Sequence, residues 1–242
     1  MGRTAVGLIA AAAALFPQLA AAADLKAPVY KAPPAPVAAY SWTGCYLGIA
    51  GGGAWGRSDH IANGPVGFGS TTGGYDVSGG LIGGTAGCNH QINQWVLGVE
   101  GDMSSTDKSG TGTNIPPFVA GTVVGTREHW IATIRGRVGF APAERWLVYA
   151  TGGFAVADVE ATIATAAVGS FADTQTRTGW TAGAGVETAF SGRWTAKLEC
   201  LHVEFGSQPY FTPSPAPALG VNSRSDVPLT NEIVRAGMNL HF

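Results

Sequence analysis

The chain has 242 residues, of which 12% are charged, 45% are hydrophobic and 36 are glycine, and its formal net charge is −2. This balance offers no basic stripe of the kind that nucleic-acid-binding proteins use, so we expect no nucleic-acid partner. Polar and apolar residues alternate rather than cluster, and together with the abundant glycine this favours many strands over helices.

The first 23 residues have the layout of a secretory signal peptide. Arg3 is followed by an apolar run over residues 5–16, and small residues at 21–23 precede the expected cleavage point. This run is much shorter than the roughly 20 apolar residues of a membrane-spanning helix, which disfavours an N-terminal anchor. Residues 24–40 are rich in proline and predict an extended periplasmic linker. The folded domain is therefore expected over residues 41–242.

Eight later segments alternate polar and apolar residues in the way that predicts strands. They lie at about residues 42–56, 78–91, 95–104, 129–140, 145–158, 176–190, 193–204 and 231–242. Tight turns are expected at 92–94, 141–144 and 191–192, and long loops at 57–77, 105–128, 159–175 and 205–230. Eight antiparallel up-and-down strands with short periplasmic turns and long extracellular loops are typical of an outer-membrane transmembrane β-barrel. A soluble lipocalin-like barrel is the alternative, and it would place the apolar face inside and the charges outside.

The tryptophans lie near the predicted strand ends, where a membrane barrel has its aromatic girdles. Four of them begin strands at the short-turn end, and three lie at the long-loop end. The predicted girdles are Trp42, Trp95, Trp146 and Trp194 at the first end and Trp55, Trp130 and Trp180 at the second. A general preference of tryptophan for strands does not predict this sorting into two rings.

One face of the predicted strands collects equal numbers of acidic and basic residues. These are Glu100, Asp102, Glu187 and Glu199, and Arg135, Arg137, Lys197 and Arg235. An eight-stranded interior is filled by side chains, and unpaired charges there would be costly to desolvate. We therefore predict an internal ion-pair network that leaves the lumen closed or only narrowly conducting. The fifth strand stays unassigned, because Trp146 and Val148 on one face and Leu147 and Tyr149 on the other are all apolar.

Signals for catalysis or cofactor binding are weak. The G-x-G-x-x-G pattern at 51–56 would need a following helix to bind a dinucleotide, and a polar loop follows instead. The histidines show no metal-ligand spacing, and no catalytic triad can be assembled around His60, His129 or His202 near the long-loop end. We expect a protein that is not an enzyme and that has no cofactor and no metal.

Segments spread over nearly the whole mature chain resemble one known family. They are DLKAPVYKAP, SWTGCYLG, WVLGVEGD, ATIRGRVGF, VYATGGFA, WTAKLECLHVEFG and IVRAGMNLHF. As a set they resemble the small outer-membrane immunogenic, porin-like barrels of alphaproteobacteria, which share the eight-stranded OmpA-type architecture. The resemblance implies an outer-membrane location, contact with lipid and lipopolysaccharide, and a function in envelope structure and loop-mediated surface interactions whose ligand or host partner is unknown. A small-solute porin or a haem-binding protein, with His60 and His129 as loop-side candidates, is the alternative.

The cysteines depart from this family, which usually carries aromatic residues at their positions. Cys45 and Cys88 lie on the outward parity of neighbouring predicted strands at similar depth, which would allow a cross-strand disulfide. Free lipid-facing thiols are the alternative, and Cys200 has no such partner.

The last strand looks like the signal that the barrel assembly machinery reads in such proteins. Its alternating residues are Val234, Ala236, Met238, Leu240 and Phe242. An ordinary lipid-facing strand has the same pattern. The two interpretations are compatible, because one strand can face lipid and also carry the assembly signal.

Overall fold

The computed structural model describes residues 40–62, 74–113, 123–165, 169–211 and 225–242. The predicted signal peptide and nearly all of the proline-rich linker lie outside the described residues. No helix in the described ranges is long and apolar enough to cross a membrane.

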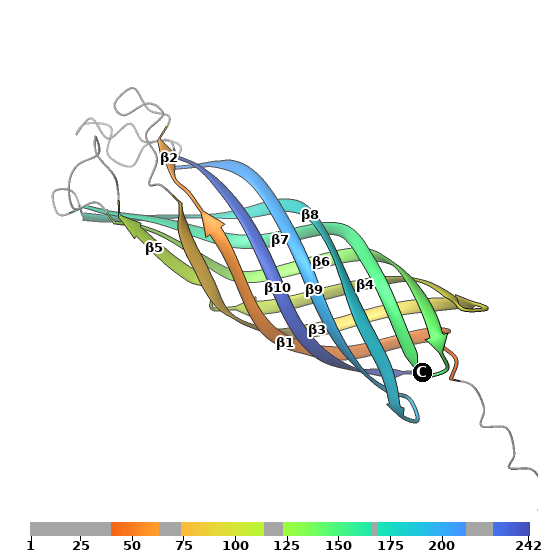
Figure 1. The fold of residues 1–242 in the computed structure, drawn as a ribbon. Coiled ribbons are helices and arrows are strands. Elements are labelled where there is room, and N and C mark those ends of the chain that lie inside the picture. Colours follow the sequence, from red (N-terminus) through yellow and green to blue (C-terminus); the bar gives the residue numbers. More distant parts are fainter. Residues whose placement is uncertain (1–39, 63–73, 114–122, 166–168, 212–224) are drawn as a thin grey trace, which may run out of the picture. The chain divides into compact units, whose positions relative to one another are not determined.

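Eight long antiparallel strands form a closed barrel (Figure 1). They are β1 (Gly44–Ser58), β3 (Tyr75–Ile92), β4 (Trp95–Thr106), β6 (Val123–Ala143), β7 (Trp146–Thr165), β8 (Gly169–Ser191), β9 (Trp194–Tyr210) and β10 (Ser225–His241). Each pairs with the next along the chain, and β1 also pairs with β10, which closes the ring. The short strands β2 (Ile61–Ala62) and β5 (Ser109–Thr113) add to the long-loop end. This confirms the predicted eight-stranded up-and-down barrel.

The strands run further at the long-loop end than the sequence pattern predicted. β7 continues to Thr165 and β8 begins at Gly169, so most of the expected loop at 159–175 is strand. The expected loops at 105–128 and 205–230 are shortened in the same way by β5, β6, β9 and β10. The predicted strands were defined by the apolar outer face, so each of them ends where that apolar face ends. Beyond that point the strands keep their backbone pairing with small polar residues such as threonine on the outside.

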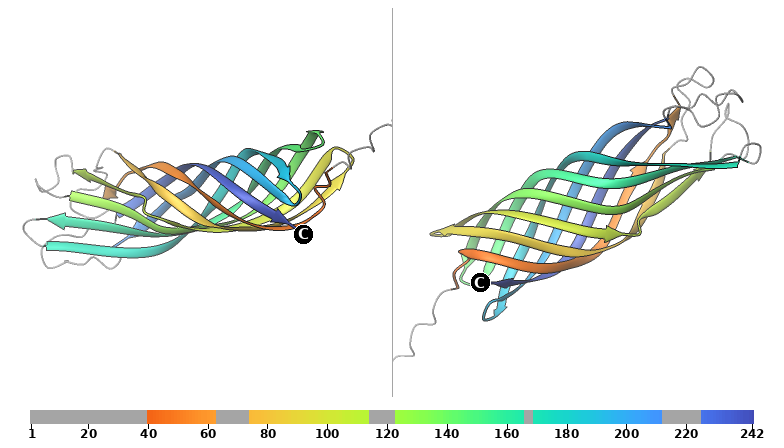
Figure 2. Two further views of the ribbon diagram at one scale, coloured as in Figure 1. Left: turned by 90° about the horizontal axis from the view of Figure 1, so that it is seen from below. Right: turned by 180° about the vertical axis from the view of Figure 1, so that it is seen from behind.

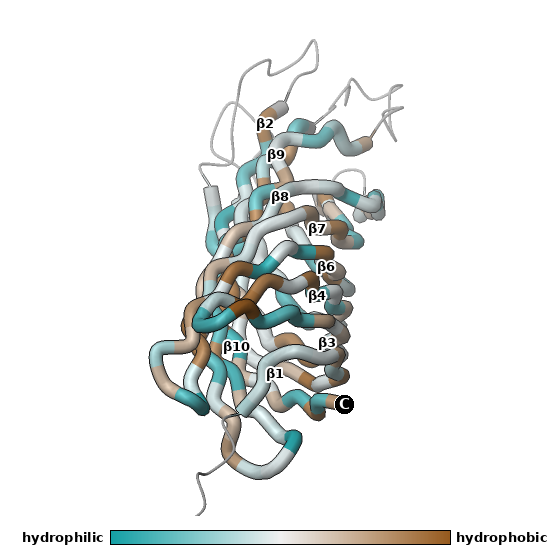
Figure 3. Tube along the Cα trace, turned by 90° about the vertical axis from the view of Figure 1, so that its right-hand side faces the viewer, coloured by the Kyte–Doolittle hydropathy of each residue, from teal (hydrophilic) through white to brown (hydrophobic). Residues whose placement is uncertain are grey.

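The two faces of the barrel wall differ sharply in composition. Large apolar side chains such as Ile82 and Phe154 are about 70% exposed on the outside, whereas the adjacent Leu81 and Ala155 are buried inside. Figure 3 shows the resulting alternation of hydrophilic and hydrophobic residues along the strands. In β7, Leu147 and Tyr149 are buried and Trp146 is exposed, which assigns the fifth strand. The lipocalin-like alternative is therefore wrong, because the apolar face is the outer one.

Small residues on the inner face make room for large ones. A Cβ atom added to Gly87 would lie 2.5 Å from the hydroxyl of Tyr46, and one added to Gly185 would lie 2.5 Å from the ring of Tyr149. A real Cβ atom essentially never comes within 3.0 Å of a non-bonded atom, so both tyrosines depend on a facing glycine. The G-x-G-x-x-G stretch likewise lies within β1 and precedes no helix.

The wall is incompletely paired at one place near the long-loop end. β8 and β9 pair only as far as Trp180 and Glu204, although both strands continue beyond these residues. Figure 2 shows the ends of the two strands moving apart. Hydrogen bonds that involve side chains replace the backbone pairing of β8 and β9 here. The side-chain amide of Gln175 donates to the carbonyl of Pro209 over 3.1 Å, and the backbone N–H of Phe211 donates to the carboxylate of Asp173 over 2.7 Å.

Candidate functional site: the layered interior of the barrel

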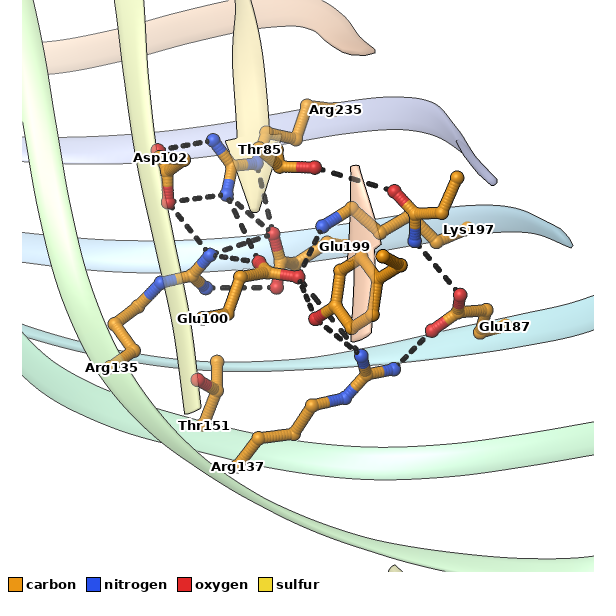
Figure 4. Close-up of polar contacts among 12 residues, drawn as sticks. Thr85, Glu100, Asp102, Arg135, Arg137, Thr151, Glu187, Lys197, Glu199 and Arg235 are labelled. Carbon is orange, nitrogen blue, oxygen red and sulfur yellow. Dashed lines mark hydrogen bonds and ion pairs between the residues drawn. The ribbon is translucent and has the colours of Figure 1, made fainter. Parts of the chain in front are cut away.

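The structure brings all eight predicted lumen charges together inside the barrel (Figure 4). Each is at most 6% exposed, and each takes part in at least one ion pair. They come from β4, β6, β8, β9 and β10, so the network ties strands from around the ring to one another. With four acids and four bases, its formal charge is zero.

Arg135 on β6 is the centre of this network. Its guanidinium nitrogens lie 2.6 Å from Glu100, 2.9 Å from Asp102 and 2.8 Å from Glu199. Arg235 on β10 repeats the arrangement from the other side, at 2.8 Å from both Asp102 and Glu199. Each guanidinium therefore meets more than one carboxylate, which is the geometry that best offsets the cost of burying charge.

The remaining charges extend the network toward the short-turn end. Lys197 donates to Glu100 over 2.7 Å, and Arg137 pairs with Glu187. Arg137 also lies 3.7 Å from the centroid of the Tyr149 ring, a cation–π contact.

Neutral side chains that the sequence analysis did not single out complete the hydrogen bonding. The hydroxyl of Tyr46 donates to Glu100 over 2.7 Å, and that of Thr133 donates to Asp102 over 2.5 Å. Glu187 accepts from Thr195 over 2.5 Å and from the amide of Asn239 over 2.8 Å. All four lie on the inward parity of their strands, so extending the face assignment from charges to uncharged polar residues would have found them.

A layer of apolar side chains lies next to the ion-pair network, on its long-loop side. Along β9 the inward residues change from Lys197 and Glu199 to Leu201, Val203 and Phe205. The layer consists of Ala54, Tyr75, Val77, Leu81, Val124, Ile131, Ala155, Ala157, Val159, Leu201, Val203, Phe205, Leu229 and Ile233. Packed apolar side chains give water nothing to bind.

A second apolar cluster lies at the short-turn end. Trp42 is fully buried there and packs with Val96, Leu147 and Tyr149, with Tyr40 against the cluster. Its backbone N–H donates to the side chain of Gln91 over 2.9 Å. Burial, with a smaller contribution from the charge of Glu187, raises the pKa of Tyr40 to about 12.

The placement of Trp42 corrects the predicted girdle. Trp42 has the same parity as Tyr46, which faces inward, whereas the prediction considered only its position along the strand. Five of the other predicted girdle residues are 44–57% exposed on the outer surface: Trp55, Trp95, Trp146, Trp180 and Trp194. Trp130 is partly exposed beside a β-bulge.

The residues of the predicted assembly signal all lie on the outer face of the last strand. Val234, Met238, Leu240 and Phe242 are 38–66% exposed, and Ala236 is exposed with them. Phe242 is also tied to the first strand, because its N–H donates to the carbonyl of Cys45 over 3.0 Å. Recognition by the assembly machinery stays a prediction.

Two of the three cysteines are joined. Cys45 on β1 and Cys88 on β3 are directly opposite each other and form a disulfide. Cys200 is exposed on the outer surface as a free thiol. The disulfide lies on the outer face, away from the interior layers.

A second, smaller polar group lies within the span of the apolar layer, since Asn231 on β10 stands between Ile233 and Leu229 of that layer. Lys108 donates to Glu128 over 2.8 Å and to Asn231 over 2.5 Å, and all three side chains are buried. The amide of Asn231 in turn donates to Glu128 over 2.8 Å. Lys108 and Glu128 fall in the loop predicted at 105–128, so alternation within the predicted strands did not indicate this pair.

The loop-side histidines do not converge on a common site. His60 is buried beside Tyr75, with 3.0 Å between its Nε2 and the tyrosine hydroxyl, and burial lowers the pKa of His60 to about 4. His129 pairs with Glu160 at 3.8 Å, and His202 with Glu232 at 2.5 Å. Across the described part of the chain, no three metal-ligating side chains gather in a group that could hold a metal ion.

A family model for the outer membrane protein β-barrel domain matches residues 8–242. The chain belongs to the outer-membrane β-barrel family. It is therefore a protein of the cell outer membrane, and the outer apolar face described above is the surface that lipid contacts.

Curated relatives of this outer-membrane barrel cover most of its length. It is 34% identical to the 31 kDa outer-membrane immunogenic protein of Brucella melitensis over 97% of this chain and 98% of the relative. It is 32% identical to the 22 kDa outer membrane protein of Rhizobium leguminosarum bv. viciae over 70% of this chain and 67% of that protein. Among solved structures, OprG of Pseudomonas aeruginosa aligns with a TM-score of 0.50 at 13% identity, covering 83% of this chain and 97% of OprG, a likeness of fold.

Proposed function

We propose that this outer-membrane barrel is a non-catalytic surface protein whose interior is sealed, and that it acts through its long-loop end and through its place in the envelope. The observation that carries the proposal is the charge-neutral ion-pair network between two apolar clusters. A diffusive pore needs a continuous polar path, and these layers replace that path with packed side chains and paired charges.

The same arrangement gives little support to the two alternatives. The lumen charges of a solute pore would be free to contact solute, whereas all eight of these are committed to one another. For haem binding, the loop-side candidate His60 is buried beside Tyr75, and His129 lies at an ion pair. The proposed role in envelope structure accordingly rests on the wall of the barrel and on its outer surface.

Single-channel recording of the refolded mature protein in a planar bilayer tests the seal. We expect no steady conductance from a sample whose heat-modifiable gel mobility shows a folded barrel. Stable openings of the folded barrel would overturn the proposal.

Two variants test which layers form the seal. Trp42→Ala removes the largest side chain of the short-turn cluster, and Leu201→Ala opens the apolar layer. Each single change leaves the ion-pair network and the other apolar cluster in place, so we expect brief openings at most from it and more openings when both clusters are opened. The matched control is Leu198→Ala on the outer face of β9, which should leave the bilayer silent.

A further inference from the structure

Arg177 on β8 differs from every arginine of the ion-pair network. Its side chain is fully buried, and it points inward, since its neighbours Thr176 and Thr178 are exposed on the outer surface. Its Nη2 donates to the carbonyls of Gly206, over 3.1 Å, and Val227. The guanidinium thus bridges the incompletely paired join between β8 and the strands that follow.

Two nitrogens of this guanidinium lack partners. Within the described residues, Nε and Nη1 of Arg177 are buried and make no hydrogen bond, and no carboxylate lies within ion-pair distance. The ring of Tyr210 lies 5.5 Å from the guanidinium carbon and offers only a weak cation–π contact. Burial accordingly lowers the pKa of Arg177, yet an arginine stays charged at neutral pH.

The nearby charges do not neutralise Arg177. Glu128 acts on it electrostatically, but the Oε2 atom of Glu128 already accepts from Lys108 and Asn231. His60 also feels the charge of Arg177 and is neutral at pH 7, because its pKa is about 4. The carboxylate of Asp173 accepts instead from Gln175 and from the N–H of Phe211. One positive charge is therefore left over in this part of the interior.

The segments outside the described residues contain no carboxylate at this end. The segments outside the described residues that join the strands here are 63–73, 114–122, 166–168 and 212–224. None of them contains an aspartate or a glutamate, and the last contains a further arginine, Arg224. A buried, uncompensated cation is costly, and it is retained in proteins mainly where a counter-ion is bound.

We propose that Arg177 is the anchor of a binding site for one small oxyanion, a carboxylate or phosphate group of a dissolved solute, that enters from the long-loop end. The Nε and Nη1 hydrogens supply charge-assisted hydrogen bonds to the oxyanion. Entry from the short-turn end is blocked by the apolar layer and the ion-pair network. Phosphates of the surrounding lipid are excluded as ligands, because the side chain faces away from the outer surface.

The test is a titration of the full mature chain, labelled with ¹⁵N and refolded in a sugar-headgroup detergent that carries no phosphate. Sodium phosphate and sodium acetate are added separately against sodium chloride at constant ionic strength, and the arginine Nε–Hε resonances are followed. The resonance of Arg177 is identified by its loss in Arg177→Gln. We expect it to shift saturably with phosphate, with acetate or with both, and not with chloride.

Two variants distinguish anion binding at Arg177 from a general effect of anions on the protein. Arg57→Gln is the matched control, because Arg57 is exposed on the outer face of β1 near the same end, and it should bind as the wild type does. Amide resonances around Tyr210 should lose their response in Arg177→Gln, with affinity at least tenfold weaker. The absence of a saturable shift at Arg177 in the wild type would overturn the proposal, as would equal binding by Arg177→Gln. The wild-type titration decides the matter even if that variant fails to fold.

Discussion

The two halves of the barrel interior handle buried charge in opposite ways. In the half nearer the short turns, eight charges from five strands cancel, and each arginine there meets at least one carboxylate. In the half nearer the long loops, most of the interior is apolar, one Lys108–Glu128 pair is balanced, and Arg177 is left without an acid. The first half is surrounded by lipid and must be neutral by itself. In the second, Arg177 lies beyond Trp180 along β8 and Glu128 lies beyond Trp130 along β6, where dissolved ions can complete the charge balance.

The largest difference between the halves should appear when an arginine is removed from each. Arg135→Met removes a positive charge that three buried carboxylates share and leaves the network with one excess negative charge, so we expect a loss of about 3–5 kcal/mol in the free energy of unfolding or a failure to refold. Arg177→Met removes hydrogen bonds to two carbonyls and leaves no carboxylate unpaired, and about 2 kcal/mol is expected. Urea titration of the refolded barrels in lipid vesicles, followed by tryptophan fluorescence, measures both.

A control on the outer face keeps this comparison interpretable. Ile134→Ala changes the neighbour of Arg135 that is 66% exposed toward lipid, and it should cost much less than Arg135→Met. Equal losses from Arg135→Met and Arg177→Met would mean that the two halves do not differ in the way described.

The Lys108–Glu128 pair should show an intermediate effect that a second substitution reverses. Lys108→Met leaves Glu128 buried with only Asn231 as a partner, and we expect a loss of about 3 kcal/mol. In Lys108→Met/Glu128→Gln the charge is gone and the amide can still bond Asn231, so most of the loss should be recovered. The same urea titration, arranged as a double-mutant cycle, measures the coupling. If the double variant is no more stable than Lys108→Met, the pair is not the isolated unit that its contacts indicate.

A pH dependence confined to the long-loop half is also expected. The pKa of His60 is about 4 in the folded barrel against 6.5 when unfolded, so between these values the unfolded chain binds more protons. Stability should therefore fall as the pH is lowered from about 6.5 to about 4, by at most about 3 kcal/mol. Histidine resonances of the folded barrel should show His60 neutral down to pH 5, and His60→Gln should flatten this part of the stability profile. A His60 resonance that titrates near 6.5 in the folded state would contradict the expectation.

Several features of the interior can be predicted from the alternation of polar and apolar residues within one strand. Others can be predicted once a predicted strand is extended. The eight network charges follow from residue parity within single predicted strands. Lys108 has the parity of Asp102 and would have been placed inside had the third predicted strand been extended; it was missed because the outer face ceases to be apolar there. Arg177 lies within the sixth predicted strand and has the parity of Glu187, so its inward direction follows from parity without any extension.

The sequence by itself determined the number of strands, the order of turns and loops, the outward apolar face and the eight charges of the ion-pair network, because all of these are properties of a period-2 pattern. The tertiary structure decided what depends on neighbours across the barrel. A β-bulge between Glu128 and Trp130 shifts the parity of β6 and turns Glu128 inward toward Lys108. The chain ahead of β1 places Trp42 in the interior, and the join between β8 and β9 leaves Arg177 without an acid. Register, bulges and the ends of pairing are set between strands, and no single strand encodes them.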